Sequence, residues 1–426
     1  MRKISIKTII SILSAKFTLF LTKTILKGGT TFPGRVALKI DKNILSKISK
    51  GYKVILVTGT NGKTTTTSMI YNIIKESGHP VITNNTGANL FPGIVTTFVD
   101  SFKFGSKVKD NYAVIEVDEA NLKYITEYIT PEVITVTNLF RDQLDRYGEV
   151  YTTLNKILEG IYNVPETTLV LNGDESLLGK LDLKNPVHFY GFDKAVNDNK
   201  TIEINADAKF CKFCKTPYEY NFVTYNHLGD FYCPNCGYKR SDLMYAVTDI
   251  IDINADSSTI KFNDLEVSIN QSGTYNIYNG LCAYSIAKEL GIDDSVIKKS
   301  LENQSSSFGR QETINVEGKD VKIFLVKNPA GYNQSLDTIC LNKERFAAAF
   351  LLNDNYADGQ DVSWIWDVDF EKLTETNIDE VYISGLRAYD MAVRLKTAGL
   401  DPNKFVIEEQ YEALTEAIKN GSCDKL

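Results

Sequence analysis

Short apolar runs rich in β-branched residues recur along the first half of the chain and alternate with segments of helical character. Five of these runs predict strands: residues 53–57, 112–117, 133–136, 168–171 and 188–190. Because they lack regular polar alternation, they are typical of strands buried on both faces. Helices are predicted at residues 68–75 and at 275–290, which Gly291 terminates. The alternation indicates an α/β fold with a parallel sheet covered by helices.

The same alternation resumes after a polar linker at residues 303–307. Further strands are predicted at residues 321–326, 346–352, 381–384 and 405–407, with a helix at 388–398 between the last two. A chain of 426 residues is long enough for two or three domains. We therefore expect a leader (1–50), a central domain (51–304) with an insertion at 205–245, and a smaller Rossmann-like α/β domain (305–426).

The leader differs from the rest of the chain in its charge. Residues 1–50 hold eleven Lys or Arg and one acid, a net charge of +10; because the whole chain carries −7, the remainder sums to −17. Lys16 interrupts the first apolar run, so no run approaches the roughly 20 residues that span a bilayer. We predict a basic amphipathic helix, on a cytoplasmic protein without an export signal. Two interpretations stay open: the helix packs on the body, or it binds an anionic phospholipid surface.

Residues 59–65 (GTNGKTT) follow a predicted strand and precede a predicted helix. Glycines in such a loop let successive backbone N–H groups face phosphate oxygens, and the helix N-terminus adds partial positive charge. Lys63 is predicted to reach the terminal phosphates of ATP, and the Thr64 hydroxyl to ligate Mg²⁺. The loop lacks the first glycine of the usual signature, since Val57 stands there. The candidate nucleotide-binding residues are Gly59, Thr60, Asn61, Gly62, Lys63, Thr64 and Thr65.

Four cysteines in the insertion have C-x₂-C-x₁₈-C-x₂-C spacing: Cys211, Cys214, Cys233 and Cys236. Each pair directs two thiolates at one centre, and four thiolates complete a tetrahedron around Zn²⁺ without room for water. The spacing therefore predicts a structural zinc ribbon; unpaired or redox-active thiols are the alternative. The segment is not strongly basic, so nucleic acid is not the expected partner.

The short loop resembles the ATP loop of the Mur ligases and of folylpolyglutamate synthase. Further segments follow in the family's order: 115–119 (IEVDE), 137–145 (TNLFRDQLD), 275–279 (YNIYN) and 309–312 (GRQE). The resemblance implies a Mur ligase-type central domain. It assigns Mg²⁺ binding to Glu116, phosphate contact to Arg310 and nucleotide contacts to Asn138, Asn276 and Asn279. Each of these residues also has a purely structural interpretation. Glu116 could be an edge-of-strand charge, Asn276 and Asn279 could be helix caps or surface amides, and Arg310 could form a surface ion pair.

Three family positions differ here. Gln143 stands where most relatives have a metal-binding His, so the resemblance assigns no ligand of a second metal to this position. Lys156 lies one residue out of register with a carbamylated lysine of the family. The ribose-binding acid is missing from the segment that reads FLVKNP at 324–329.

Two features that the sequence lacks restrict the possible substrate and the source of ammonia. Only about 50 residues precede the loop, whereas family members acting on nucleotide-linked precursors carry a larger N-terminal domain. The chain has three histidines and no cysteine in a Gly-flanked elbow, so it offers few groups for glutamine hydrolysis. Segments 28–34, 353–367 and 384–391 resemble an amidating branch of the family. The resemblance implies a glutamine amidotransferase partner and amidation of the D-glutamate α-carboxylate of the lipid II stem peptide, through an acyl phosphate.

The acidic cluster of segment 353–367 is a candidate for binding ammonia or for contacting the amidotransferase; its members are Asp354, Asp358, Asp361 and Asp367. We hypothesise that Asp358 orients the catalytic histidine of the amidotransferase; a solvated acidic loop is the alternative. Two other functions remain open: a ligase that adds an amino acid, as folylpolyglutamate synthase does, and a non-catalytic ATP-responsive scaffold with a zinc module.

Overall fold

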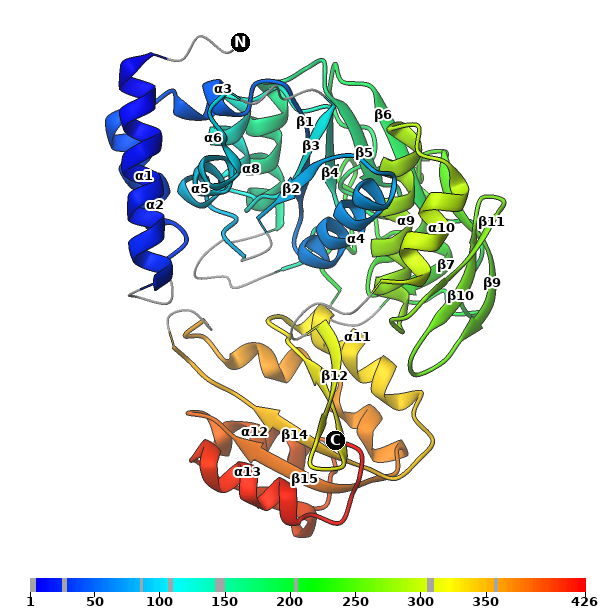
Figure 1. The fold of residues 1–426 in the computed structure, drawn as a ribbon. Coiled ribbons are helices and arrows are strands. Elements are labelled where there is room, and N and C mark those ends of the chain that lie inside the picture. The colour runs from blue at the N-terminus through cyan, green and yellow to red at the C-terminus, as the bar shows by residue number, and fades with distance from the viewer. Residues whose placement is uncertain are drawn as a thin grey trace.

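The computed structural model describes residues 5–24, 29–84, 87–105, 110–141, 150–202, 206–304, 310–355 and 359–426. Figure 1 shows two unequal parts: a large one built from the N-terminal and middle segments, and a smaller one formed by the C-terminal segment beneath it. The division of the chain at residues 50 and 304 remains a prediction, but three separate apolar clusters fill these parts.

A nine-stranded sheet forms the centre of the large part, and all its strands run in the same direction except β10, which pairs antiparallel with β9 and β11. The expected, mainly parallel sheet is therefore confirmed. In spatial order its strands are β11 (Leu265–Ile269), β10 (Ser258–Phe262), β9 (Tyr245–Ile253), β6 (Val187–Phe192), β5 (Thr168–Asn172), β4 (Val133–Val136), β1 (Tyr52–Thr58), β3 (Asn111–Glu116) and β2 (Val81–Thr83).

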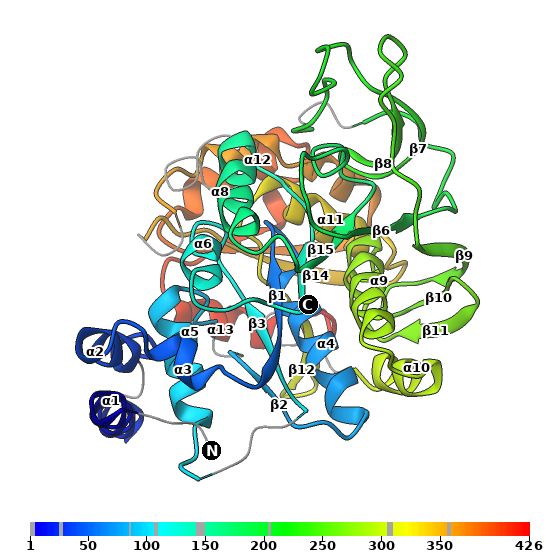
Figure 2. The same cartoon turned by 90° about the horizontal axis from the view of Figure 1, so that it is seen from above.

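Helices cover both faces of this sheet, as Figure 2 shows from above. Within β1, Ile55 and Val57 pack in one apolar cluster, while Val54 and Leu56 pack in the other. This division explains why the strand has apolar residues at odd and even positions. The first face holds α4 (Lys63–Glu76), α9 (Thr274–Glu289) and α10 (Asp294–Glu302); the second holds α5 (Phe91–Ser101), α6 (Leu122–Thr126) and α8 (Val150–Tyr162).

The N-terminal segment forms α1 (Ile6–Thr24), α2 (Phe32–Ile40) and α3 (Ile44–Ile48). Lys16 does not interrupt α1, which continues for five turns. Ile12 and Ala15 join the second apolar cluster, so one face of the helix packs on the body. Among the described residues, no helix is long and apolar enough to span a bilayer.

The insertion contains β7 (Glu219–Tyr225) and β8 (Leu228–Tyr232), an antiparallel pair that projects beyond the large sheet in Figure 2. It lies between β6 and β9 in the chain, and β9 begins at Tyr245, where the insertion was expected to end.

The smaller part contains the parallel strands β14 (Phe346–Leu351), β15 (Ile378–Ser384) and β16 (Phe405–Ile407). Its helices are α11 (Pro329–Cys340), α12 (Ala388–Thr397) and α13 (Tyr411–Asn420), with short 3₁₀ turns η1 (Ser363–Asp367), η2 (Phe370–Glu375) and η3 (Pro402–Lys404). The strand predicted at 321–326 does not join this sheet. Instead, β13 (Lys319–Phe324) pairs antiparallel with β12 (Arg310–Val316). The two residues between them, Glu317 and Gly318, both have positive φ, as a two-residue hairpin turn requires.

Candidate functional site

The loop between β1 and α4 takes a conformation that only glycine accepts easily at two positions. Gly59 has φ +118° and Gly62 has φ +85°. A Cβ atom on Gly59 would lie 2.8 Å from the backbone nitrogen of Thr137, so the loop passes too close to the end of β4 for any side chain. The two glycines of the predicted motif therefore allow both the tight turn and this close approach.

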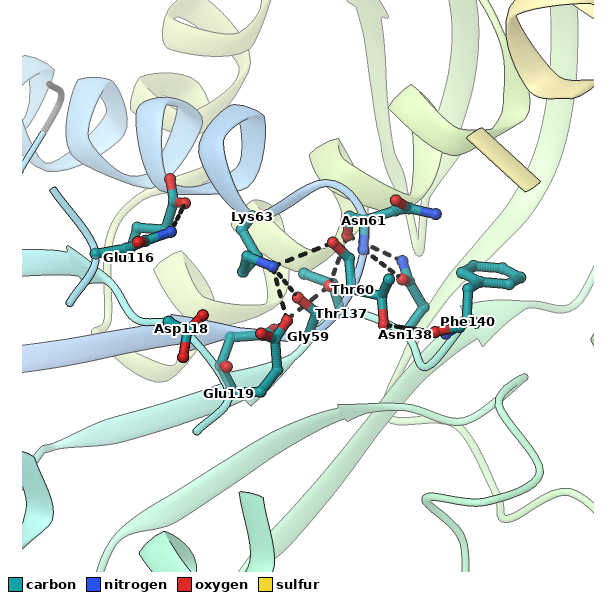
Figure 3. Close-up of polar contacts among 12 residues, drawn as sticks. Gly59, Thr60, Asn61, Lys63, Glu116, Asp118, Glu119, Thr137, Asn138 and Phe140 are labelled. Atoms are coloured by element: carbon teal, nitrogen blue, oxygen red, sulfur yellow. Dashed lines mark hydrogen bonds and ion pairs between the residues drawn. The ribbon is translucent and has the colours of Figure 1, made fainter. Parts of the chain in front are cut away.

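The residues that follow β4 hold the loop by hydrogen bonds, drawn in Figure 3. The Thr60 N–H donates to the Asn138 carbonyl (2.9 Å), and the Asn61 N–H donates to the Asn138 side-chain oxygen (2.8 Å). The Asn61 carbonyl accepts from the Thr137 hydroxyl (2.7 Å) and from the Asn138 amide (3.1 Å). The Thr60 hydroxyl in turn bonds the backbone of Phe140. These hydrogen bonds hold the loop against the residues that follow β4.

Lys63 folds back over the loop toward an acid. Its ammonium group donates to the carbonyl of Gly59 (2.5 Å) and to that of Thr60 (3.1 Å), and it forms an ion pair with Glu119 (2.7 Å). Burial raises the pKa of Glu119, and the charge of Lys63 opposes that rise. Glu119 did not stand out in the sequence as a functional residue. The only indication was its place directly after a buried strand, next to Glu116 and Asp118.

Thr64 and Glu116 lie together at the start of α4. The Thr64 hydroxyl donates to the Glu116 carboxylate (2.9 Å), and the Asn89 amide donates to the other oxygen (3.0 Å). The backbone of Glu116 is held in both directions by the Asn84 side chain (2.9 and 2.8 Å). Because β3 lies between β1 and β2 and Glu116 is buried, its interpretation as an edge-of-strand charge is wrong. A hydroxyl and a fixed carboxylate are the oxygen ligands that Mg²⁺ accepts.

Asn276 and Asn279 are buried side by side on α9. Asn279 accepts from the Thr66 hydroxyl (3.2 Å) and donates to Asn276 (3.1 Å), which donates to the carbonyl of Ser272 (2.8 Å). They are 1% and 4% exposed and lie inside the helix, so both structural alternatives, helix caps and surface amides, are wrong. The side chain of Asn279 packs so closely on Gly62 that a Cβ atom there would clash with it, so α9 is in direct contact with the loop.

A cavity of about 360 Å³ opens over the loop, between the large and small parts of the molecule. Its volume falls in the range of small-molecule sites. Glu116, Glu119 and both asparagines of α9 contribute to its lining, and residues 324–328 contribute from the other side. Asn328 caps α11 by accepting from the Gly331 N–H (2.8 Å) and donates its amide to the Asn61 side chain (3.0 Å). The two parts therefore meet directly at the loop.

Other predicted site residues are placed less directly. Arg310 begins β12, but its side chain lies outside the part of the chain that the structure describes. Asp358 and Gln143 lie outside the described residues altogether. The next residue, Gln311, lines the cavity and exchanges two hydrogen bonds with the backbone of Ser272 (3.0 and 2.8 Å). Lys156 lies on α8 and is not among the residues that line the cavity.

The four cysteines of the insertion converge on one point. Their sulfur atoms lie within 4.8 Å of one another, with 3.6 Å between Cys211 and Cys236 and 3.4 Å between Cys214 and Cys233. A hydrogen bond with the Thr216 hydroxyl lowers the pKa of the Cys214 thiol to about 5. The group could hold a metal ion, and four sulfur donors leave no position for water.

Both cysteine pairs adopt the same turn. The N–H of Lys215 donates to the carbonyl of Cys211 (2.9 Å), and the N–H of Gly237 donates to that of Cys233 (3.1 Å). The two donors share a left-handed conformation, with φ +63° and +70°. Such repeated turns aim both thiols of each pair inward, as a tetrahedral site requires.

The insertion is joined to the loop through a buried hydrogen bond between side chains. His227, in the turn between β7 and β8, lies 2.8 Å from the Glu175 carboxylate, and both side chains are fully buried. The same carboxylate accepts the N–H of Leu139 (3.2 Å), the residue after Asn138. The Tyr238 hydroxyl also donates to the carbonyl of Ser176 (2.6 Å). The position of the insertion is thereby linked to the segment that holds the loop.

Two family models match the chain and together cover most of its length. Residues 57–237 match the Mur ligase middle domain, and residues 325–426 match the MurT ligase C-terminal model. The lipid II isoglutaminyl synthase (glutamine-hydrolyzing) subunit MurT of Streptococcus pneumoniae is 40% identical over 98% of this chain and 93% of its own length. The chain belongs to the MurT family of Mur ligases.

Other MurT and Mur ligase proteins agree with this placement. The MurT subunit of Staphylococcus aureus is 34% identical over 95% of this chain and 91% of its own length. The pseudomurein peptide ligase type C from Methanothermus fervidus shares the fold, with a TM-score of 0.66 over 90% of this chain and 76% of that one at 21% identity. As a member of the MurT family, the chain is a ligase, and the expected Mur ligase fold is confirmed.

The hydrogen bonds between residues 59–61 and residues 137–140 form a clamp on the loop. Replacing Asn138 with Ala tests whether this clamp holds the loop in the conformation that binds nucleotide. The change removes two hydrogen bonds to Asn61, so we expect the Kd for Mg-ADP to rise by roughly tenfold, measured by titration calorimetry. Asn420→Ala, at an exposed position at the end of α13, serves as the matched control. An Asn138→Ala protein that melts like the parent and binds Mg-ADP equally well would show that the loop does not need the clamp.

Proposed function

We propose that this chain is the ATP-binding ligase subunit of a glutamine-dependent amidating enzyme of cell-wall synthesis. The observation that carries the proposal is its similarity, over nearly its whole length, to a subunit of lipid II isoglutaminyl synthase. The acceptor is the D-glutamate α-carboxylate in the stem peptide of lipid II, which becomes the amide of D-isoglutamine. The partner is the glutamine amidotransferase GatD. Because the acceptor is lipid-linked and the reaction consumes ATP, we place the reaction at the cytoplasmic face of the membrane.

The chemistry requires that the carboxylate be activated, because oxide is a poor leaving group. A carboxylate oxygen attacks the γ-phosphorus of ATP, the bond to the β-phosphate oxygen breaks, and ADP leaves. Ammonia then attacks the carbonyl carbon of the acyl phosphate; phosphate departs, and the nitrogen loses a proton to give the amide. The first step develops negative charge around the transferring phosphoryl group and the second on the departing phosphate, and cations must offset the charge in both.

The residues of the site have separate roles in this scheme. The backbone of residues 59–65 holds the phosphates, and Lys63 leaves Glu119 for the terminal phosphate. Thr64 and Glu116, 2.9 Å apart, would hold Mg²⁺, which offsets charge on the phosphates. Asn276 and Asn279 would face the adenine, and Arg310 would approach the phosphates from the start of β12.

The histidines of the chain support an external source of ammonia. His188 is paired with Glu289 (2.6 Å), and His227 is buried against Glu175. Neither these two nor His79 is among the residues that line the cavity over the loop. A glutaminase that uses a cysteine nucleophile with a histidine base needs both at an accessible site, and neither residue type is among those that line the described cavity. We therefore assign glutamine hydrolysis to the partner.

Two further roles belong to the proposal. The four cysteines hold Zn²⁺ as a structural ion, since thiolate ligands and closed tetrahedral geometry favour it. Asp358 orients the catalytic histidine of the amidotransferase, as the third member of a triad shared between the subunits.

Amidation by the reconstituted complex tests the proposed reaction. With ATP, Mg²⁺, glutamine and lipid II, we expect the parent to convert the D-glutamate residue to its amide, followed by mass spectrometry. Lys63→Ala should lower the rate by at least about a hundredfold, because it removes charge from the phosphoryl-transfer step. Lys200→Ala, on the surface, is the control. ATP turnover stimulated by a free amino acid without the amidotransferase would contradict the proposal, as would ATP binding without acyl phosphate formation.

The Asp358→Asn variant tests the shared triad. We expect ATP binding by the chain to be unchanged and glutamine hydrolysis by the complex to fall at least about tenfold, because the partner's histidine loses its orienting carboxylate. Asp256→Asn, at a strongly exposed site on the large part, is the control. Unchanged glutaminase activity in a complex that still assembles would reject the role of Asp358.

Metal analysis tests the cysteine site. The purified chain should contain about one zinc ion per molecule, and Cys233→Ser should lose it and melt at a lower temperature, since the small hydrophobic cluster around the cysteines depends on closure of the site. Cys340→Ser, away from the cluster, should keep both metal and stability. A parent protein that binds no metal, with the same melting temperature before and after chelation, would refute the assignment.

A further inference from the structure

Helix α1 presents a continuous apolar stripe to solvent. Its members are spaced alternately by four and three residues, so they line one side of the helix, and each is between 52% and 77% exposed: Ile6, Ile10, Leu13, Phe17 and Phe20. Single exposed apolar residues are normal on a protein surface, whereas a contiguous row along a helix marks an interaction site.

The opposite face of α1 is fixed on the body, so the stripe has a defined direction. Ile12, Ala15 and Leu19 are buried. The Thr8 hydroxyl donates to Asp41 (2.7 Å), and the Ser11 hydroxyl donates to the carbonyl of Ala37 (2.8 Å). The apolar side chains therefore cannot turn inward without breaking these contacts. In this arrangement the helix is held by one face and leaves the other to a second apolar environment.

Lysines border the stripe on both sides. On an α-helix, where each residue advances by about 100°, Lys7 lies beside one edge and Lys16 and Lys23 lie beside the other. Lys16 and Lys23 also contact Asp100 of α5 (3.2 and 3.0 Å), which keeps them along that edge. The exposed positions of α2 add Arg35 and a further lysine, Lys39. This cationic surface belongs to the segment that carries +10 on a chain of −7.

The position of α1 in the molecule leaves the stripe accessible to a flat surface. Figures 1 and 2 both place α1 at the outer margin of the large part, away from the smaller C-terminal part. Phe32, at the start of α2, is 55% exposed and adds another large apolar side chain to the same hairpin of helices.

We propose that α1 binds the surface of an anionic phospholipid bilayer, lying in the plane of the membrane with its apolar stripe in the acyl boundary and its lysines at the headgroups. An apolar face bordered by lysines is the pattern of helices that lie in membrane interfaces. A second copy of the chain fits less well, because a symmetric contact would bring the lysine rows of both copies together. The proposal goes beyond the proposed reaction and does not depend on it.

Vesicle flotation of the full chain tests the proposal. The parent should float with vesicles of phosphatidylcholine and phosphatidylglycerol, less with phosphatidylcholine alone, and less in high salt. Leu13→Ser with Phe17→Ser should lower the partition coefficient at least about tenfold, and Lys7→Gln with Lys16→Gln should lower binding to the anionic vesicles only. The matched control for the apolar pair is Met244→Ser with Ile251→Ser, two exposed residues directly before and within β9. The matched control for the lysine pair is Lys184→Gln with Lys200→Gln, which are also exposed.

A second measurement keeps the result independent of folding and of the reaction. Each variant should bind Mg-ADP as the parent does. In the Phe17→Trp variant, brominated lipids should quench the tryptophan fluorescence more strongly than they quench that of the parent. Failure of the parent to bind anionic vesicles would overturn the proposal, as would equal binding by the Leu13→Ser and Phe17→Ser protein. Loss of a dimer by that variant, without vesicle binding by the parent, would assign the stripe to a second copy instead.

Discussion

The hydrogen-bond clamp between residues 59–61 and 137–140 is the constraint on which the site depends. It exists because β1 is paired in parallel with β4 on one side and β3 on the other, with Thr58 opposite Val136 and Val57 opposite Glu116. The carboxyl ends of the three strands therefore meet at one edge of the sheet. The glycine loop, the acids after β3 and the amide of Asn138 come together there, although they are up to about eighty residues apart in the chain. A register shift of one residue would turn Glu116 to the other face.

Buried charge extends this constraint into the cysteine insertion. Glu175 and His227 are fully buried and paired, and removal of one partner would leave the other charge or dipole without compensation, which costs several kcal/mol. Asp174, the preceding residue, is held by Arg240 of the insertion (3.0 Å) and by Tyr278 of α9 (2.6 Å). The insertion therefore contacts both the segment that clamps the loop and the helix that carries the two asparagines. Its attachment by buried polar groups, rather than by apolar contact alone, fixes its orientation relative to the site.

The sequence pattern predicted those elements whose structure is determined by their own residues, such as a continuous apolar run or a glycine motif. The strands at 133–136 and 405–407 coincide with β4 and β16, and the loop lies between β1 and α4 as its motif requires. The helix α2 and strands β9–β11 did not stand out, because their residues are not uniformly apolar and their burial comes from tertiary neighbours. The pairing of β12 with β13 was missed for a different reason: the two-residue turn at Glu317 and Gly318 was not recognised.

The site was predictable to the extent that its residues belong to a motif. Glu116, Asn138 and Asn279 were proposed from their family segments, and the structure brings them together around the loop and the start of α4. Glu119, Asn84 and Asn89 were not, because each contacts a residue distant in sequence; the position of Glu119 after a buried strand did not reveal its partner Lys63, and nothing near Asn84 or Asn89 revealed theirs. Polar residues in loops have many possible partners, and only the sheet order decides which of them meet.

The pairing of Lys63 with Glu119 has a consequence for ligand binding. The ammonium is already satisfied by a buried carboxylate and two carbonyls, so a phosphate that binds Lys63 replaces an anionic partner rather than a shell of water. Its net gain in free energy is smaller than that of a new ion pair, because the old pair must be broken. The displaced carboxylate stays buried beside Asp118, where burial and the neighbouring charge both raise its pKa. Once Lys63 has moved to the phosphate, the Glu119 carboxylate binds a proton or a cation more tightly. Phosphate binding in the loop therefore favours the binding of positive charge at Glu119 and the neighbouring acids.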